Sequence, residues 1–530
     1  MKPQEAFRET SRVLFGQEIG ELTDFADYLG EFVLPCQNRK SFISGKDVLI
    51  SHNFYPSSAK FISHDEMSLL GSKFTPLETK DIKDIDSLLS AVRERVVFCG
   101  NKVLGKCENV QNVDNCVECS DVFQVHNVFH VRNSAYTSYV READHVFGVG
   151  VHPLINYSMR CLEGIHLMRC FESFYCSKAS DCYYSFNCSN STDCFFTFNQ
   201  RSARRMIGNV QLDRDKYAEL KKKLLSEMAD ELKRKKKLFS MADLVNYDVP
   251  PGESDVEAAN EPGRCPERVE NAFRKTSSLM LGTELKNIDD YGPWLTERTL
   301  RWSKVLDSSG KPTYKVGGFP VVGKISSRKL VDAEEALKRG SLKIKEEDMK
   351  DLRTLMERSS KIAFVTFEII DGLAEEVVDV PSIFVGSGIY RVWDTTNSKN
   401  CAYSSAAIES SFMFGGYLRV LDSHFSINCF DSTKLKTCFE CDASYSLNAS
   451  YFCHNSENLD NCMFCFNEKG KSYAIAGTEV GREEFMRLKK ILLDHVNREL
   501  LTEKRTGLSI FSIKGTSFSL ESRRLKPGHD

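Results

Sequence analysis

Three pairs of cysteines in this sequence have the spacing of zinc ligands. Each pair reads Cys-x-x-Cys, the form in which many structural zinc sites present two thiolates. The pairs are Cys116 and Cys119, Cys438 and Cys441, and Cys462 and Cys465. His126 and His130 follow the first pair. Because structural zinc needs four converging ligands, two such pairs would have to meet around one ion. Zinc is therefore the one cofactor for which the sequence offers ligands.

The surroundings of these pairs favour packed thiols over a metal site. The pairs lie inside repeating segments that we expect to be strands, where residues three apart point to opposite sides. The spacing from Cys119 to His126 is also shorter than zinc-finger patterns require. The chain has 19 cysteines, an odd number, and begins without an export signal. We therefore expect reduced cysteines that pack as small hydrophobic residues.

Disulfides are another use for so many cysteines. Five of them recur every six residues from Cys170 to Cys194, so neighbouring thiols could staple short turns of chain. Further along, serines stand at the equivalent positions. The equivalents of Cys176, Cys182 and Cys188 are Ser444, Ser450 and Ser456. Serine suits a small ladder position better than half of a covalent bridge, which argues against both staples and an obligatory metal cluster.

A block of positive charge follows the first cysteine-rich segment. It consists of Lys233, Arg234, Lys235, Lys236 and Lys237. Such a block could contact the phosphates of a nucleic acid, which makes nucleic acid a candidate partner. The second half of the chain lacks this cluster, and charged helix faces are more often simply solvated. The net charge of -3 argues against a nucleic-acid surface over the whole molecule.

The sequence offers no constellation for catalysis. Glu172 and Glu440 occupy equivalent positions, and paired carboxylates could serve a carbohydrate-active β-helix enzyme, but neither has an evident carboxylate partner. Gly148-x-Gly150 and Gly386-x-Gly388 are isolated glycine pairs without the rest of a phosphate-binding motif. We assign no catalytic residue.

A repeat organises the cysteine-rich segments. From Cys170 to Asn199, hexads rich in aromatic residues alternate with hexads of small polar residues, so the true period is twelve. A short fixed period is typical of solenoids, in which each coil stacks on the next. Twelve residues suit a coil of two short strands and two tight turns, with cysteines and rings in internal ladders. A three-sided helix of eighteen-residue coils is the competing geometry.

The whole design occurs twice. Residues Ala6–Ser11 recur as Ala272–Ser277, and Cys170–Glu172 recur as Cys438–Glu440, at almost the same interval along the chain. We therefore predict an α+β fold with tandemly duplicated short-coil parallel β-solenoid domains, each ending in a capping helix. The predicted units are an α/β module (1–95), a cysteine-rich β-solenoid (96–209), a capping helix (210–242), a linker (243–265), a second α/β module (266–380), a second β-solenoid (381–480), a second capping helix (481–503) and a tail (504–530).

Three local expectations accompany this division. Apolar residues at helical spacing predict a helix within Lys80–Arg95 of the first module. Asp213 or Asp215 can cap the first solenoid-covering helix, and Gly481 precedes the second. In the tail, Ser509–Ile513 suggests a strand.

Length and composition set broad limits on the chain. Its 530 residues exceed one hydrophobic core, and its 41% hydrophobic and 27% charged content is ordinary for a soluble protein. The N-terminal residues lack the apolar core of a signal peptide, and the longest apolar run, Ile362–Ile370, is too short to span a bilayer. We expect a protein of the cytoplasm or of a viral particle that does not interact with membranes.

The junction between solenoid and helix resembles a known group. The string Cys194-x4-Asn199, then Ile207-x-Asn209-x-Gln211, then Tyr217 is similar to the end of cysteine-rich repeat proteins of uncultivated bacteria and phages. Val210 and Leu212 depart from that group's pattern. The group has no assigned activity, so the resemblance implies a repeat protein and carries no functional residue across.

Taken together, these features predict a structural or interaction protein. The solenoids would present rigid faces of Ser, Asn and aromatic residues to a protein partner within a larger assembly, such as a virion, and the chain could oligomerise there. A zinc-binding, nucleic-acid-associated protein is the alternative, and a carbohydrate-active enzyme is the third.

Overall fold

A computed structural model describes most of the chain. The described residues are 2–71, 73–138, 141–149, 155–160, 168–251, 255–258, 263–317, 320–418 and 420–513. Gly150 of one glycine pair, parts of the linker and the end of the tail therefore lie outside the described residues. The fold is α+β, as the sequence predicts, with most strands in parallel sheets.

The helices divide into long and short ones. Those of the described residues are α1 (Pro3–Phe15), α2 (Ala26–Gly30), α3 (Met67–Gly71), α4 (Ile85–Arg93), α5 (Arg214–Lys235), α6 (Met241–Val245), α7 (Glu267–Leu281), α8 (Gly292–Leu295), α9 (Ala333–Arg339), α10 (Leu352–Ser359) and α11 (Arg482–Glu503). The predicted helix in Lys80–Arg95 is α4, which Asp84 caps by accepting the Ser87 N–H. Asp213 caps α5 by accepting two N–H groups, and α11 begins directly after Gly481.

The strands of the first half form two parallel stacks. A nine-stranded sheet comprises β5 (Val103–Leu104), β6 (Glu108–Gln111), β7 (Asp114–Val117), β8 (Ser120–Phe123), β9 (His126–Arg132), β10 (Ala135–Ser138), β11 (Arg141–Asp144), β12 (Phe147–Val149) and β13 (Ile155–Asn156). A four-stranded sheet comprises β14 (Ser180–Tyr183), β15 (Thr192–Phe195), β16 (Arg204–Ile207) and β17 (Val210–Gln211).

The second half carries one longer stack. This eleven-stranded sheet comprises β20 (Ile369–Val378), β21 (Ser382–Tyr390), β22 (Asp394–Ala402), β23 (Ala406–Ile408), β24 (Ser411–Phe414), β25 (His424–Ile427), β26 (Thr433–Phe439), β27 (Tyr445–Asn448), β28 (Glu457–Met463), β29 (Ser472–Ile475) and β30 (Thr478–Glu479). Three two-stranded sheets lie outside these stacks. They are the hairpins of β1 (Gln37–Lys40) with β2 (Asp47–Ile50) and of β18 (Trp302–Leu306) with β19 (Pro312–Val316), and the parallel pair of β3 (Phe61–Ser63) with β4 (Phe98–Gly100).

Neighbouring strands pair at the twelve-residue interval that the sequence predicts. In the four-stranded sheet Cys182 lies opposite Cys194, and in the eleven-stranded sheet Leu447 lies opposite Leu459. Three pairs of strands include a thirteen-residue interval: Val103 lies opposite Cys116, Ile369 opposite Ser382, and Ser411 opposite His424. Since the same residue type recurs at that interval, like side chains stack on like.

The backbone bends to the left-handed region at every third residue of these segments. Asn109, Asn112, Asn115, Glu118 and Asp121 all have φ between 51° and 53°. Asn and Asp tolerate this conformation better than most residues do. Four such bends in most twelve-residue intervals divide the chain into very short straight sides.

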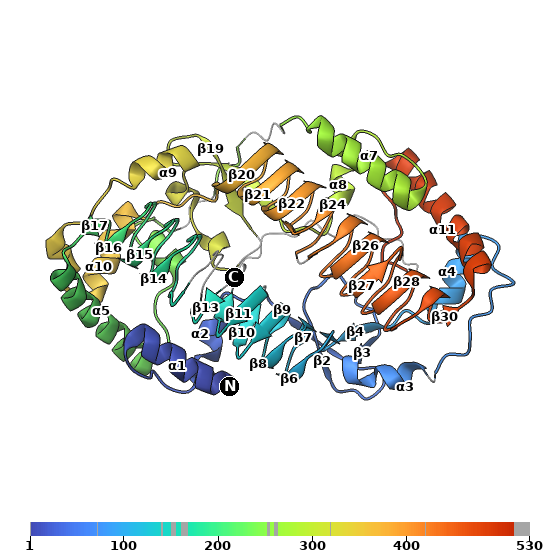
Figure 1. Cartoon of the computed structure of the whole chain (residues 1–530), viewed down its shortest axis with the longest axis horizontal. Helices are drawn as coiled ribbons and strands as arrows, with labels where there is room; N and C mark the ends of the chain where they lie inside the picture. The colour runs from blue at the N-terminus through green and yellow to red at the C-terminus, as the bar shows by residue number, and fades with distance from the viewer. Residues whose placement is uncertain are drawn as a thin grey trace.

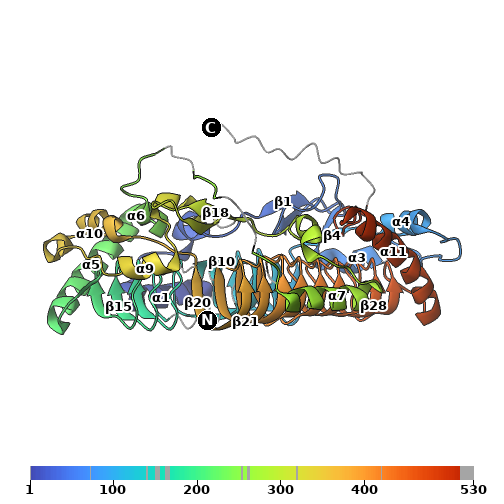
Figure 2. The ribbon, with the colours of Figure 1, turned by 90° about the horizontal axis from the view of Figure 1, so that it is seen from above.

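The two halves of the chain cover each other. Figure 1 shows α3 and α4, from the first half, beside α11 and the last strands of the second half, and α9 and α10, from the second half, beside α5 and β15–β17. Figure 2 shows the same neighbours from above. Hydrogen bonds fix both junctions. The side-chain amide of Asn467 donates to the carbonyl of Val97 (2.8 Å), and that of Asn199 donates to the carbonyl of Phe364 (2.8 Å).

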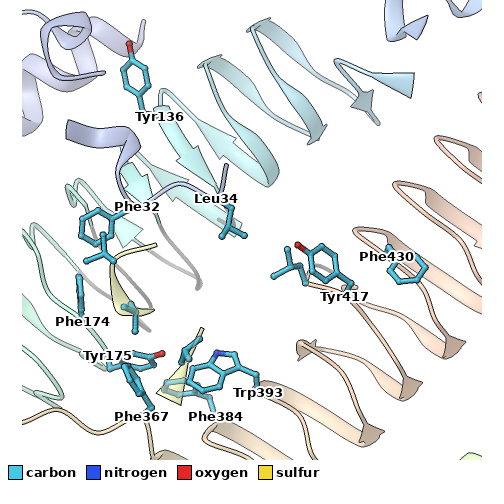
Figure 3. Close-up of a cluster of buried hydrophobic side chains, with 14 of the residues drawn as sticks. Phe32, Leu34, Tyr136, Phe174, Tyr175, Phe367, Phe384, Trp393, Tyr417 and Phe430 are labelled. Atoms are coloured by element: carbon cyan, nitrogen blue, oxygen red, sulfur yellow. The ribbon is translucent and has the colours of Figure 1, made fainter. Parts of the chain in front are cut away.

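An aromatic cluster fills the centre of the molecule (Figure 3). Phe367 from the second half lies between Tyr175 of the first half, with ring centroids 5.8 Å apart, and Trp393 (6.0 Å). Phe32 meets Phe174 edge to face at 5.6 Å. These buried rings give the two halves a common core, because each large ring removes much apolar surface from water.

Candidate functional site

The six cysteines predicted as zinc ligands point into the interiors of the stacks. Cys116 and Cys119 belong to one buried cluster with valines, and the other four belong to a second cluster in the eleven-stranded sheet. The expectation that cysteines three apart face opposite sides is wrong. Because the backbone bends at every third residue, positions three apart both turn inward.

Five of these six thiols donate to backbone carbonyl groups two residues before and nine residues after the cysteine. The Sγ atom of Cys438 lies 3.5 Å from the carbonyl oxygens of Lys436 and Leu447, and burial raises the pKa of this thiol well above its ordinary value. A metal ligand must be a thiolate. Among the described residues, no group of three or more His, Cys, Asp or Glu side chains is arranged to hold a metal ion. The thiols are packed as small side chains, and five of them hydrogen-bond to the backbone.

Removing metal tests this role. We expect that dialysis against EDTA will leave the thermal unfolding midpoint unchanged, because the sulfur atoms already bond to carbonyl groups. Atomic absorption of the undialysed protein provides the control. Release of about two zinc ions per chain together with unfolding would support the zinc site instead.

Serines in the second half form backbone hydrogen bonds at positions equivalent to those of cysteines in the first half. Ser444 Oγ donates to the carbonyl of Asp442 (2.9 Å), and its oxygen accepts the N–H of Ser456 (3.2 Å), one interval later. Cys176, the equivalent of Ser444, bonds to the carbonyls of Phe174 and Ser185. All 18 cysteines in the described residues are free, which agrees with the prediction against disulfides.

Because cysteine and serine occupy equivalent interior positions, we expect the interior to tolerate the replacement of one by the other. Cys176→Ser should change the free energy of unfolding by less than about 1 kcal/mol, since serine keeps the size and the hydrogen bonds. Cys176→Leu should cost about 1–3 kcal/mol, because extra methylene groups do not fit a filled interior. Urea unfolding of both variants measures this. If both variants lost the same free energy of unfolding, the interior would not be filled in the way that this prediction requires.

The two equivalent glutamates are buried, and among the described residues neither is hydrogen-bonded to a second carboxylate that could share acid–base catalysis. Burial raises the pKa of Glu172 to about 8, while Arg160, with Nε 3.2 Å away, opposes that shift. Glu440 accepts hydrogen bonds from the hydroxyl of Ser509 (2.9 Å) and the N–H of Ile510 (3.0 Å). Both side chains are fully enclosed. Glu440 attaches the tail to the sheet, and the tail around Ile510 forms turns where a strand was expected.

The basic block Lys233–Lys237 lies at the end of α5, against the first helix. Lys233 donates to the side-chain oxygen of Gln17 (2.6 Å), and Lys236 pairs with Asp24 (3.1 Å). Lys235 pairs with Glu231 one turn earlier (2.6 Å). Three of the five cations therefore already have partners within the chain, so the block offers less free charge than the sequence suggests.

A buried polar network lies where the first module meets both large sheets, and no sequence pattern indicates it. Lys102 Nζ lies 2.8 Å from both carboxylate oxygens of Asp114, and neither side chain is more than 1% exposed. Nearby, Asp442 of the eleven-stranded sheet accepts hydrogen bonds from Tyr55 (3.0 Å) and His454 (2.8 Å). The network therefore joins segments from opposite halves of the chain.

One long surface remains open to solvent, and we call it the strand face. In Figure 1 the strands of the sheets face the viewer, and Figure 2 shows the hairpins and short helices on the opposite side. We define the face by successive register partners, all exposed or half-buried. They are Lys399, Ser411, His424, Lys436, Asn448, Asp460 and Ser472 in the eleven-stranded sheet.

The strand face is mostly small and polar, with one aromatic step. The half-buried rings of Phe412 and Phe425 stack at 4.5 Å with planes 16° apart, beside the strand-face residues Ser411 and His424. Asn448 donates to Asp460 across one register interval (2.6 Å). The face therefore combines hydrogen-bonding groups at regular spacing with a local apolar patch.

No family model, curated protein or solved structure matches the chain. None of the described helices combines the length and the hydropathy that crossing a bilayer requires.

Proposed function

We propose that this chain is a structural or interaction protein that presents its strand face to a protein partner within a larger assembly. The observation that carries the proposal is the strand face itself, which is long, regular and exposed or half-buried along its length. Surfaces of this kind are typical of repeat proteins, whose stacked units create extended binding faces.

The architecture that carries the strand face belongs to the same proposal. Each stack of parallel strands is a short-coil β-solenoid in which twelve residues make one circuit. Four left-handed bends in each interval, together with pairing at that interval on successive coils, support this geometry. The inward-facing cysteines and serines would be the ladders of that solenoid, and the helices α5 and α11 would cap it.

Equivalent contacts support two tandem copies. The hydroxyl of Tyr183 donates to the carbonyl of Leu14 (2.8 Å), and that of Tyr451 donates to the carbonyl of Met280 (2.7 Å). The sequence repeat relates the two tyrosines to each other, and it relates the two acceptors in the same way. Each first helix would thus rest on its own solenoid in the same manner.

Rigidity follows from how the stacks are closed. The interior clusters are filled by side chains, and filled interiors transmit strain rather than deform. The module of each half packs on the last coils of the other, so the C-terminal end of the stack in each half is covered. A covered end cannot add a further strand from another molecule, which leaves the faces for binding.

An affinity capture from the native source tests the proposal. Lys436→Glu with Asn448→Glu changes the centre of the strand face, and Lys60→Glu with Lys80→Glu makes a matched change at exposed residues of the first module. We expect a stoichiometric protein partner to be captured by the unaltered chain and the module variant, and lost with the face variant. A partner lost only with the module variant would place the interface elsewhere.

A further inference from the structure

A positively charged cleft lies where the four-stranded sheet meets α5. Its volume is about 520 Å³, and it opens between the last two parallel strands of that sheet and the first turns of the helix. The polar residues that line it are Thr192, Asp193, Arg204, Arg205, Arg214 and Lys221. Four of these six side chains are cationic.

Most of this positive charge is uncompensated. Lys221 Nζ pairs with Asp193 Oδ1 at 2.8 Å, so the single lining carboxylate is already neutralised. Within the described part of the chain, no carboxylate or carbonyl group bonds to the guanidinium groups of Arg204, Arg205 or Arg214. The nearby Asp213 is engaged as the cap of α5, where it accepts the N–H groups of Asp215 and Lys216.

The fold does not require Arg204 or Arg205. At the equivalent positions of the second half, Ser472 and Tyr473 replace Arg204 and Arg205. The local structure is nevertheless the same, because β29 pairs with β28 at the same interval and ends in the same antiparallel hairpin. Three arginines around one hollow, two of them at positions where serine and tyrosine fold equally well, indicate a role in binding.

We propose that this cleft binds a small ligand that carries two or more phosphate groups, a property beyond the protein interface proposed above. Guanidinium groups bind phosphate oxygens in pairs, and several around one hollow match a multiply charged anion. A long nucleic acid fits less well. The Lys233–Lys237 block lies at the far end of α5, about 30 Å along a helix of this length, and is largely paired.

Calorimetric titration of the full chain with inorganic pyrophosphate tests the cleft. Arg204→Ser with Arg205→Tyr installs the residues of the second half, and its unfolding midpoint shows whether the fold is kept. Lys399→Ser with Lys436→Ser removes two cations from the strand face of the other half as a matched control. We expect saturable binding by the unaltered chain and the control, and at least a tenfold weaker affinity in the cleft variant.

Three results would overturn the assignment. The first is no saturable binding of pyrophosphate, and the second is an equal loss of pyrophosphate affinity in the cleft variant and the control. The third is that a 20-nucleotide single strand binds more tightly than pyrophosphate, through Lys233–Lys237 rather than through the cleft. The last result would assign the charge to nucleic acid. Because this assay needs no protein partner, its failure leaves the strand-face proposal standing, and the reverse also holds.

Discussion

Replacing Lys102 with methionine should destabilise the protein by about 3–5 kcal/mol, because the change leaves the carboxylate of Asp114 buried without its cation. Asp114 Oδ1 also accepts the backbone N–H of Lys102 (3.0 Å), and Ser51 donates to the other oxygen. Those bonds remain, but they do not neutralise the charge. The free energy of the first unfolding transition in urea measures the loss.

Lys106→Met is the matched control, since Lys106 is exposed four residues further along the chain. We expect its effect to stay within about 0.5 kcal/mol. The account of the junction would be wrong if the two variants lost the same stability. A small loss for both would mean that water reaches Asp114.

Replacing Asp442 with asparagine should also cost stability, by about 3 kcal/mol at neutral pH, because buried donors lose a charged acceptor. Tyr55, His52 and His454 all point at this carboxylate. The Nε2 atom of His454 accepts the N–H of Cys99 (2.9 Å), so its Nδ1 carries the proton that Asp442 accepts. An asparagine would place its NH₂ group against one of these donors.

The loss should depend on pH in a defined direction. Burial opposes ionisation of Asp442, but the neighbouring His52 and the hydrogen bond from His454 hold its pKa below the ordinary value. A carboxyl group with a lowered pKa stabilises the fold above its unfolded pKa of about 4, and that contribution fades as the pH falls below it. The difference between the unaltered chain and Asp442→Asn should therefore be full at pH 7 and shrink below pH 4.

Asp422→Asn serves as the control for the second prediction. Asp422 is exposed at a left-handed bend, a conformation that asparagine also tolerates. We therefore expect no measurable change in the free energy of unfolding at any pH. A difference between Asp442→Asn and the unaltered chain that grows as the pH falls would contradict the assigned ionisation.

Local patterns in the sequence predicted the elements well. The spacing of cysteines gave the interval at which Cys182 and Cys194 pair, and the serine substitutions indicated interior positions without disulfides. Helices followed from apolar periodicity and capping, as α4 and Asp213 show. These features depend only on residues close in the chain, which a sequence displays directly.

The bends at every third residue escaped prediction, and with them the direction of the cysteine pairs. Asn and Asp occupy many bends, but Tyr136, Glu172 and Phe196 adopt the same left-handed conformation. No local preference of those three residues favours it. The hydrogen bonds to the adjacent strands impose the bend, so the signal lies in the stack and not in the residue.

The junctions between the halves left no signal in the sequence either. Lys102 and Asp442 lie in different halves of the chain, and neither belongs to a motif. Nothing in the composition around Asn199 or Asn467 tells that each will bond to the other half's module. Only the assembled fold brings such groups together.

Disulfide trapping tests most directly the claim that twelve residues make one coil. Asn448 and Asp460 are register partners on the strand face, about 5 Å apart as neighbouring strands are, whereas Lys436 and Asp460 are two strands apart, at about 10 Å. Under mild oxidation, Asn448→Cys with Asp460→Cys should form a disulfide that peptide mass spectrometry identifies, while Lys436→Cys with Asp460→Cys should not, since a bridge spans less than about 7 Å. A bridge in the second variant and none in the first would contradict the stacked coils.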